Sequence, residues 1–202
     1  MFANEDRDVK IFGKNSSETQ QDSEKALLRD IDEQHQNGNM ALAKALGRQL
    51  ADELLSANSA SALGCGNGED EDIDVSFQRR VLLAFCVEVG LDIYVPNDVV
   101  SSAANSEFNK YLENEYPDFY KRVMDMGAFS LYYLSLRTND KADVAIGEVF
   151  SKLCTGEIQE FYTTLGQSLF ACFMGAIEQK INSMGFVGFD NANSEMLIKE
   201  RD

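Results

Sequence analysis

The sequence contains few of the residues on which turn-rich folds and most hydrolytic sites depend. Only two of its 202 residues are proline, one is histidine, and tryptophan is absent. So few prolines favour helices over a fold of short strands and tight turns. A catalytic triad or a Cys–His pair needs an imidazole, and His35 is the only candidate.

Long apolar runs are missing as well. The two longest, 81–87 and 169–177, fall far short of the roughly 18 residues that span a bilayer. The start of the chain is charged and no apolar stretch follows it, so we expect no signal peptide and no membrane insertion.

The four cysteines form neither a CxxC pair nor an evenly spaced set. The sequence therefore predicts no zinc site and no disulfide framework. Cys65 lies in a glycine-rich loop, whereas Cys86, Cys154 and Cys172 lie in apolar stretches, where free thiols pack as small hydrophobic groups. We therefore expect a cytoplasmic protein of the bacterial type, in a reducing compartment.

Basic side chains are outnumbered, because 18 Lys and Arg stand against 34 Asp and Glu, for a net charge of −16. Phosphate backbones are bound by clustered Lys and Arg, so nucleic acid is not an expected partner. The charge suits a soluble protein and is compatible with a basic protein partner.

The apolar content, 44% of the chain with 13 Phe and 7 Tyr, is enough for a core. Leucine and alanine recur at three- and four-residue spacing, which predicts an all-α fold: a single bundle of about six or seven helices. We divide the chain into a flexible arm (1–20), a helical domain (21–189) and a polar tail (190–202). Within the domain, an acidic loop (56–75) separates an N-terminal hairpin from the main bundle.

The hairpin consists of two amphipathic helices. The turn from Gly38 to Ala43 resembles that of a tetratricopeptide repeat. Asp30, Ile31 and Gln34 replace the Leu, Gly and Tyr of that repeat, and no copy follows at a period of about 34 residues. The resemblance therefore implies only the hairpin and no function. The apolar positions are Ala26, Leu27, Leu28 and Ile31 in the first helix and Leu42, Leu46, Leu50 and Leu54 in the second.

In the main bundle we expect helices over about 76–89, 97–114, 117–136, 140–154 and 157–184. Gly90 is expected to end the first of them, followed by an extended connector at 91–95. The last helix is the longest and is apolar nearly all round its middle, so we expect it near the centre.

Two segments suggest binding. Asp70, Asp72 and Asp74 alternate as at the start of a calcium loop, but Val residues replace the Gly and Glu that such a loop needs. A weak divalent-cation site is one hypothesis there, and a solvated acidic linker is the other. Near the C-terminus, Phe186, Val187 and Phe189 are apolar outside any predicted helix, so they either fold back or bind a partner protein.

Further signals for chemistry are sparse. Asp32 and His35 share a helix face, but a di-iron bundle needs two such pairs, so we expect a solvated histidine. Glu88 interrupts an apolar run, either as a carboxylate with a raised pKa or with its head in water. The glycine-rich segment 64–68 leads into carboxylates that would repel a phosphate, so we expect no nucleotide and no cofactor.

An aromatic cluster is concentrated between 111 and 133, where helix-core packing and a ligand pocket are the two interpretations. Its members are Tyr111, Tyr116, Phe119, Tyr120, Phe129, Tyr132 and Tyr133. Our leading hypothesis is a non-enzymatic helical interaction or structural module that binds a second copy or another protein. The alternative is a small-ligand-binding protein or enzyme with an interhelical carboxylate/tyrosine pocket.

Overall fold

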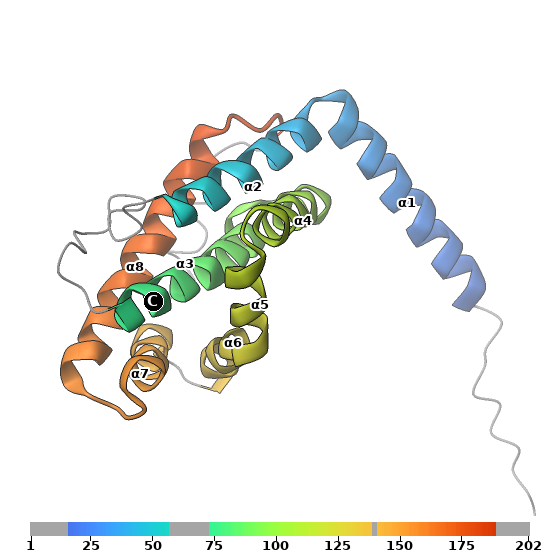
Figure 1. Cartoon of the computed structure of the whole chain (residues 1–202). Helices are drawn as coiled ribbons and strands as arrows, with labels where there is room; N and C mark the ends of the chain where they lie inside the picture. Colours follow the sequence, from blue (N-terminus) through green and yellow to red (C-terminus); the bar gives the residue numbers. More distant parts are fainter. Residues whose placement is uncertain (1–15, 57–72, 139–140, 189–202) are drawn as a thin grey trace, which may run out of the picture.

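Eight α-helices and no strand make up the described part of the chain, which in the computed structural model is residues 16–56, 73–138 and 141–188 (Figure 1). This confirms the all-α prediction, with one more helix than the upper estimate. The helices are α1 (Ser16–Gln36), α2 (Asn39–Leu55), α3 (Ile73–Tyr94), α4 (Asp98–Glu115), α5 (Pro117–Met126), α6 (Ala128–Thr138), α7 (Ala142–Thr155) and α8 (Glu160–Ser183).

The core is built around α3, in which residues 81–87 are buried without interruption. A helix buried on all sides has to be apolar on all sides, and this run contains only apolar residues and cysteine. The long helix α8 packs along α3 and α7, while α2 packs on α4 (Figure 1). Along α8, Phe161 and Cys172 are exposed, as Ile93 is near the end of α3.

Glycine allows several of these helices to approach closely. A Cβ on Gly47 of α2 would lie 2.4 Å from the carbonyl oxygen of Ala104 on α4. Between α7 and α8, a Cβ on Gly166 would lie 2.7 Å from the Cβ of Phe150. These contacts bring the backbones together, as small residues do at tight helix crossings.

The prediction that Gly90 ends a helix is wrong. The helix α3 runs through Gly90 to Tyr94, so the expected connector at 91–95 is mostly its last turn. A Cβ on Gly90 would lie 2.8 Å from Cγ2 of Ile177, so this glycine makes room for α8. A glycine that serves packing and one that ends a helix look alike in a single sequence.

The predicted helix over 117–136 is divided into α5 and α6. Gly127 between them has φ +63°, a left-handed conformation that glycine adopts without strain. Its N–H donates to the carbonyl of Met124, as in a helix C-cap. The apolar pattern continues across this break and did not reveal it.

The cysteines differ from the expectation that Cys86, Cys154 and Cys172 all pack as free thiols. Cys86 is buried and Cys154 is half-buried, and neither forms a disulfide. Cys172 is exposed and disulfide-bonded, and Cys65 lies outside the described residues. This removes part of the basis for the expected reducing location.

Three predicted segments lie wholly or partly outside the described residues. Helix α1 begins at Ser16, inside the predicted arm. Most of the acidic loop and the residues from Phe189 onward fall outside. No helix in the described ranges is both long and apolar enough to cross a membrane.

Candidate functional site

Helix α1 extends away from the bundle and contacts it only near its C-terminal end (Figure 1). All residues from 22 to 29 are exposed, and Leu27 and Leu28 keep 53% and 61% of their surface. Leu27 shares a helix face with Ile31, which is half-buried, and Gln34, which is buried. The face that contacts the bundle therefore continues beyond it as an exposed apolar surface.

Charge is unevenly distributed around this helix. At about 100° per residue, Glu24 projects between the exposed leucines and Arg29 projects from nearly the opposite side, while Asp32 and Lys25 project from almost the same direction beside Leu28. All four are exposed. Lys25 lies 4.0 Å from Asp22, at the outer limit of an ion pair. The leucine surface thus has one carboxylate, Glu24, between its leucines, and both a carboxylate and an ammonium group at its edge. We call Glu24, Leu27, Leu28 and Asp32 the α1 face.

Hydrogen bonds attach the base of α1 to α4. The side-chain N–H₂ of Asn97 donates to both carboxylate oxygens of Asp30, at 3.1 and 3.0 Å. Nε2 of Gln34 donates to the same carboxylate at 3.0 Å. The side-chain oxygen of Asn97 accepts from the N–H groups of Val99 and Val100 and so caps α4. The direction of α1 is therefore set by a residue whose own position is fixed.

The same network holds the segment after α8. Asn39 is completely buried, and its Nδ2 donates to Oε1 of Gln34 at 2.7 Å. Nδ2 also donates to the carbonyl of Val187 at 2.9 Å, and Oδ1 accepts from the Val187 N–H at 2.8 Å. One side chain thus satisfies both backbone groups of Val187. We call this pairing the Asn39 clasp.

The clasp bears on the predicted partner site near the C-terminus. Phe186 is half-buried and packs on the core, so the chain folds back at this point. Val187 exposes 54% of its side chain, and Phe189 lies outside the described residues. Partner binding by these three residues stays a prediction. A hollow of about 420 Å³ lies beside the clasp, lined by Glu33, Gln34, Gln36, Asn37, Val187 and Gly188.

A second polar cluster lies between α3, α4 and α6. Oε1 of the half-buried Glu88 accepts from Asn109 at 3.3 Å, and Oε2 accepts from the Tyr133 hydroxyl at 3.4 Å. Burial raises the pKa of Glu88, the two hydrogen bonds oppose the rise, and the charge of Asp92 adds to it. Burial and the neighbouring carboxylates raise the pKa of Tyr133 to about 12.

Asp92, one turn further along α3, accepts from Ser101 and Asn105 of α4, both at 3.1 Å. The side-chain oxygen of Asn105 is buried without a hydrogen-bond donor. Glu88 was a sequence candidate, whereas Ser101, Asn105 and Asn109 were not. Their four-residue spacing on one face of α4 was the available signal. We call Glu88, Asp92 and the side chains that donate to them the Glu88 cluster. Both carboxylates accept hydrogen bonds from neutral donors on neighbouring helices.

The best-buried members of the aromatic cluster belong to the hydrophobic core and do not line a pocket. Tyr132 is completely buried and stacks on Phe85 with 4.9 Å between ring centroids. Phe85 also meets Phe129 and Tyr133 edge-on. Tyr116 is the exception, with 43% of its surface exposed. Offset and edge contacts of this kind stabilise a core beyond the area they bury.

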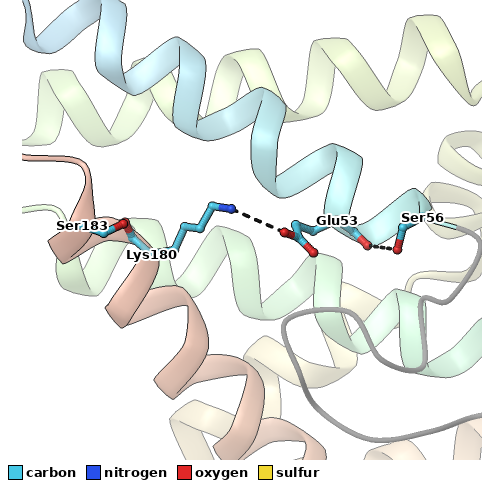
Figure 2. A network of polar contacts seen from close by, with 4 residues as sticks. All are labelled: Glu53, Ser56, Lys180 and Ser183. Atoms are coloured by element: carbon cyan, nitrogen blue, oxygen red, sulfur yellow. Dashed lines mark hydrogen bonds and ion pairs between the residues drawn. The ribbon is translucent and has the colours of Figure 1, made fainter.

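A further hollow, of about 340 Å³, lies where α2 approaches α8. Figure 2 shows Lys180 of α8 facing Glu53 of α2, at 3.5 Å between Nζ and Oε1. Ser56 donates to the carbonyl of Glu53, and Ser183 donates to that of Lys180. This ion pair links the two helices. It contributes little free energy, because both side chains are partly exposed. The hollow is lined by Gln49, Asp52, Glu53, Ser56 and Lys180.

Only part of the predicted cation site lies in the described residues. Asp70 and Asp72 lie outside the described residues, and Asp74 is exposed in the first turn of α3. His35 is exposed in the last turn of α1, as expected for a solvated histidine. Within the described ranges, no three or more His, Cys, Asp or Glu residues converge to hold a metal ion.

Comparisons with known proteins do not assign this chain to a family. No protein-family model matches it, and neither a curated protein nor a solved structure shows significant similarity. The functional argument therefore depends on the residues described above.

Proposed function

We propose that this chain is a non-enzymatic protein-interaction module and that helix α1 is its binding element. The observation that carries the proposal is the exposed α1 face, which continues a face that packs on the bundle nearer the C-terminal end of the helix. Exposed apolar residues on one face of a helix are typical of a helix that binds in an apolar groove of another protein. A partner is expected to cover Leu27 and Leu28.

The network at the base of α1 also supports the proposal. Asn97, Asp30 and Gln34 hold the helix at one angle before a partner arrives. A binding element that is already oriented loses less entropy on association. Burying a leucine completely is worth about 1.5–3 kcal/mol, so two half-exposed leucines can supply a useful share of a micromolar affinity.

The test compares the full chain with the variant Leu27→Gln/Leu28→Gln as baits in a pull-down from source lysate. We expect wild type to retain a partner that the variant does not retain. The matched control is Leu131→Gln/Ile158→Gln, which changes two side chains that are 46% and 52% exposed elsewhere. Circular dichroism checks folding, and size-exclusion chromatography with light scattering measures self-association. A monomer that retains the same proteins with or without the leucines contradicts the proposal.

The Glu88 cluster supports a second candidate, a small-ligand site or an active site. Its basis is a half-buried carboxylate with a raised pKa beside Asp92 and the donorless oxygen of Asn105. A thermal-shift screen of metal and organic cations tests it. A ligand that stabilises wild type and not Glu88→Gln favours this candidate, and equal shifts for both proteins count against it.

A further inference from the structure

We propose that residues 189–202 of the same chain fold back over the two exposed leucines of the α1 face and are displaced when a partner binds. The inference concerns the regulation of the proposed binding element, so it rests on the proposed function. The occupants are three consecutive apolar residues, Met196, Leu197 and Ile198. They lie outside the described residues, but the point at which the chain leaves those residues is fixed.

The Asn39 clasp fixes this point at the base of α1. Both backbone groups of Val187 bond to the side chain of Asn39, which also donates to Gln34 of α1. Gly188 follows and lines the hollow beside α1 together with Gln34. In Figure 1 the segment after α8 accordingly runs toward the turn between α1 and α2. The next residues of the chain therefore start beside the helix that carries the exposed leucines.

The exposed leucines lie within reach of this starting point. Gln34 and Leu27 are seven residues apart, which places them on one face of α1 with a rise of about 10 Å between them. Met196 follows Gly188 by eight positions, and an extended chain of that length spans about 26 Å. The intervening residues 190–195 include no apolar side chain larger than that of alanine. They form a polar spacer that is longer than the distance it has to bridge.

The chemistry of the segment favours the same contact. Within residues 190–202, Met196, Leu197 and Ile198 are the apolar side chains larger than alanine. Leu27 and Leu28 keep 53% and 61% of their surface exposed, so each group can remove the other from water. Methionine is unbranched and adapts to an irregular apolar surface.

The short connection favours the same chain over a second copy as the occupant. A tether of a few residues holds its segment at an effective concentration in the millimolar range. A weak contact is therefore populated within one chain, whereas the same contact between two chains at micromolar concentration is not. Such a contact also gives way to a partner that buries more apolar area, which makes it suited to regulation.

The experiment uses the absence of tryptophan from the chain. In the full-length protein, Ile198→Trp introduces a single fluorescent reporter into the segment. We expect its emission maximum to move to longer wavelength when Leu27→Gln/Leu28→Gln is added, because the ring loses its apolar cover. The matched control Leu131→Gln/Ile158→Gln should leave the emission unchanged. Dilution should also leave it unchanged, since the contact lies within one chain. Circular dichroism checks that each variant is folded.

A second measurement tests the regulation. In the pull-down described above, Met196→Gln/Leu197→Gln/Ile198→Gln should retain about twofold more partner than wild type, because a face that is covered half of the time binds with half the affinity. The control Asn191→Gln/Asn193→Gln changes only the polar spacer and should retain as much as wild type.

Two optical results overturn the inference: an emission maximum that does not respond to Leu27 and Leu28, and one that changes with protein concentration, which identifies a second copy as the occupant. Equal retention by wild type and the Met196 triple variant overturns the regulatory role. In all three cases the proposed function stands if retention still depends on the leucines. A leucine-dependent emission shift without any retained partner supports the fold-back and rejects the interaction function.

Discussion

Helices α1 and α8 are of similar length, 21 and 24 residues, yet they differ in how far they are buried in the bundle. Phe173 and Ile177 of α8 are completely buried, whereas residues 22–29 of α1 are all exposed. Both segments have apolar residues at helical spacing, so both were predicted as helices. The comparison teaches that spacing predicts the helix and that the amount of apolar surface decides whether it is buried.

The contrast extends to the backbone. Helix α8 carries Gly166, which meets Phe150 and Gly147 of α7 at close range. The sequence of α1 has no glycine and is rich in charged residues, so it cannot approach a neighbour in this way. It is attached to the bundle by hydrogen bonds that Asn97 donates to Asp30 and Asn39 donates to Gln34.

The largest expected effect is that of removing a buried side chain from α8. Phe173→Ala should lower the free energy of unfolding by about 3–5 kcal/mol, because it removes a completely buried ring and leaves a cavity. Leu27→Ala on α1 should change it by less than about 0.5 kcal/mol. Urea denaturation measures both. Similar losses for the two variants would mean that α1 packs in solution.

Next in size is the effect of adding a methyl group to α8. Gly166→Ala should destabilise the protein by about 1–3 kcal/mol, because the new Cβ would lie 2.7 Å from the Cβ of Phe150. Gly175→Ala is the matched control on the same helix, with open space around the new Cβ. It should be neutral or stabilising by up to about 1 kcal/mol. If thermal denaturation shows equal effects for the two, the close approach of α7 and α8 is wrong.

The Asn39 clasp gives an intermediate effect at the base of α1. Asn39→Ala should cost about 1–2 kcal/mol, because the backbone of Val187 and the side chain of Gln34 lose their partner. Hydrogen exchange at the Val187 amide should accelerate with it. Asn182→Ala, at an exposed position of α8, is the control. An unchanged Val187 exchange rate would refute the clasp.

The smallest effect is expected at Glu88, and it depends on pH. Burial raises the pKa of this carboxyl above its ordinary value of 4.5, so the folded state binds its proton more tightly than the unfolded state. Its contribution to stability is complete below that ordinary value and is lost as the pH rises through the folded pKa. Glu88→Gln should therefore stabilise the protein by less than about 1 kcal/mol at pH 7. Melting curves of wild type and variant at pH 7 and below pH 4.5 measure this difference in stability. A stabilisation by Glu88→Gln that is as large below pH 4.5 as at pH 7 contradicts this assignment.

The sequence predicted more of the fold than of the candidate site. Periodicity located nearly every helix, but Gly90, which serves packing, was misread as a helix end, and the break at Gly127, which adopts a left-handed conformation, was missed. Leu27 and Leu28 were recognised as an apolar face, and nothing in their spacing told whether the bundle covers them. The pairing of Asn39 with Val187 joins positions 148 residues apart, which no local pattern records.

The sequence by itself determined the helical class and the acidic charge, since these follow from composition and from spacing within single helices. Only the tertiary structure decided that residues 81–87 of α3 are buried, that residues 22–29 of α1 are exposed, and that Glu88 accepts hydrogen bonds from Asn109 and Tyr133. The reason is physical: burial depends on which faces meet across the bundle, and that depends on the whole set of helices competing for the same core.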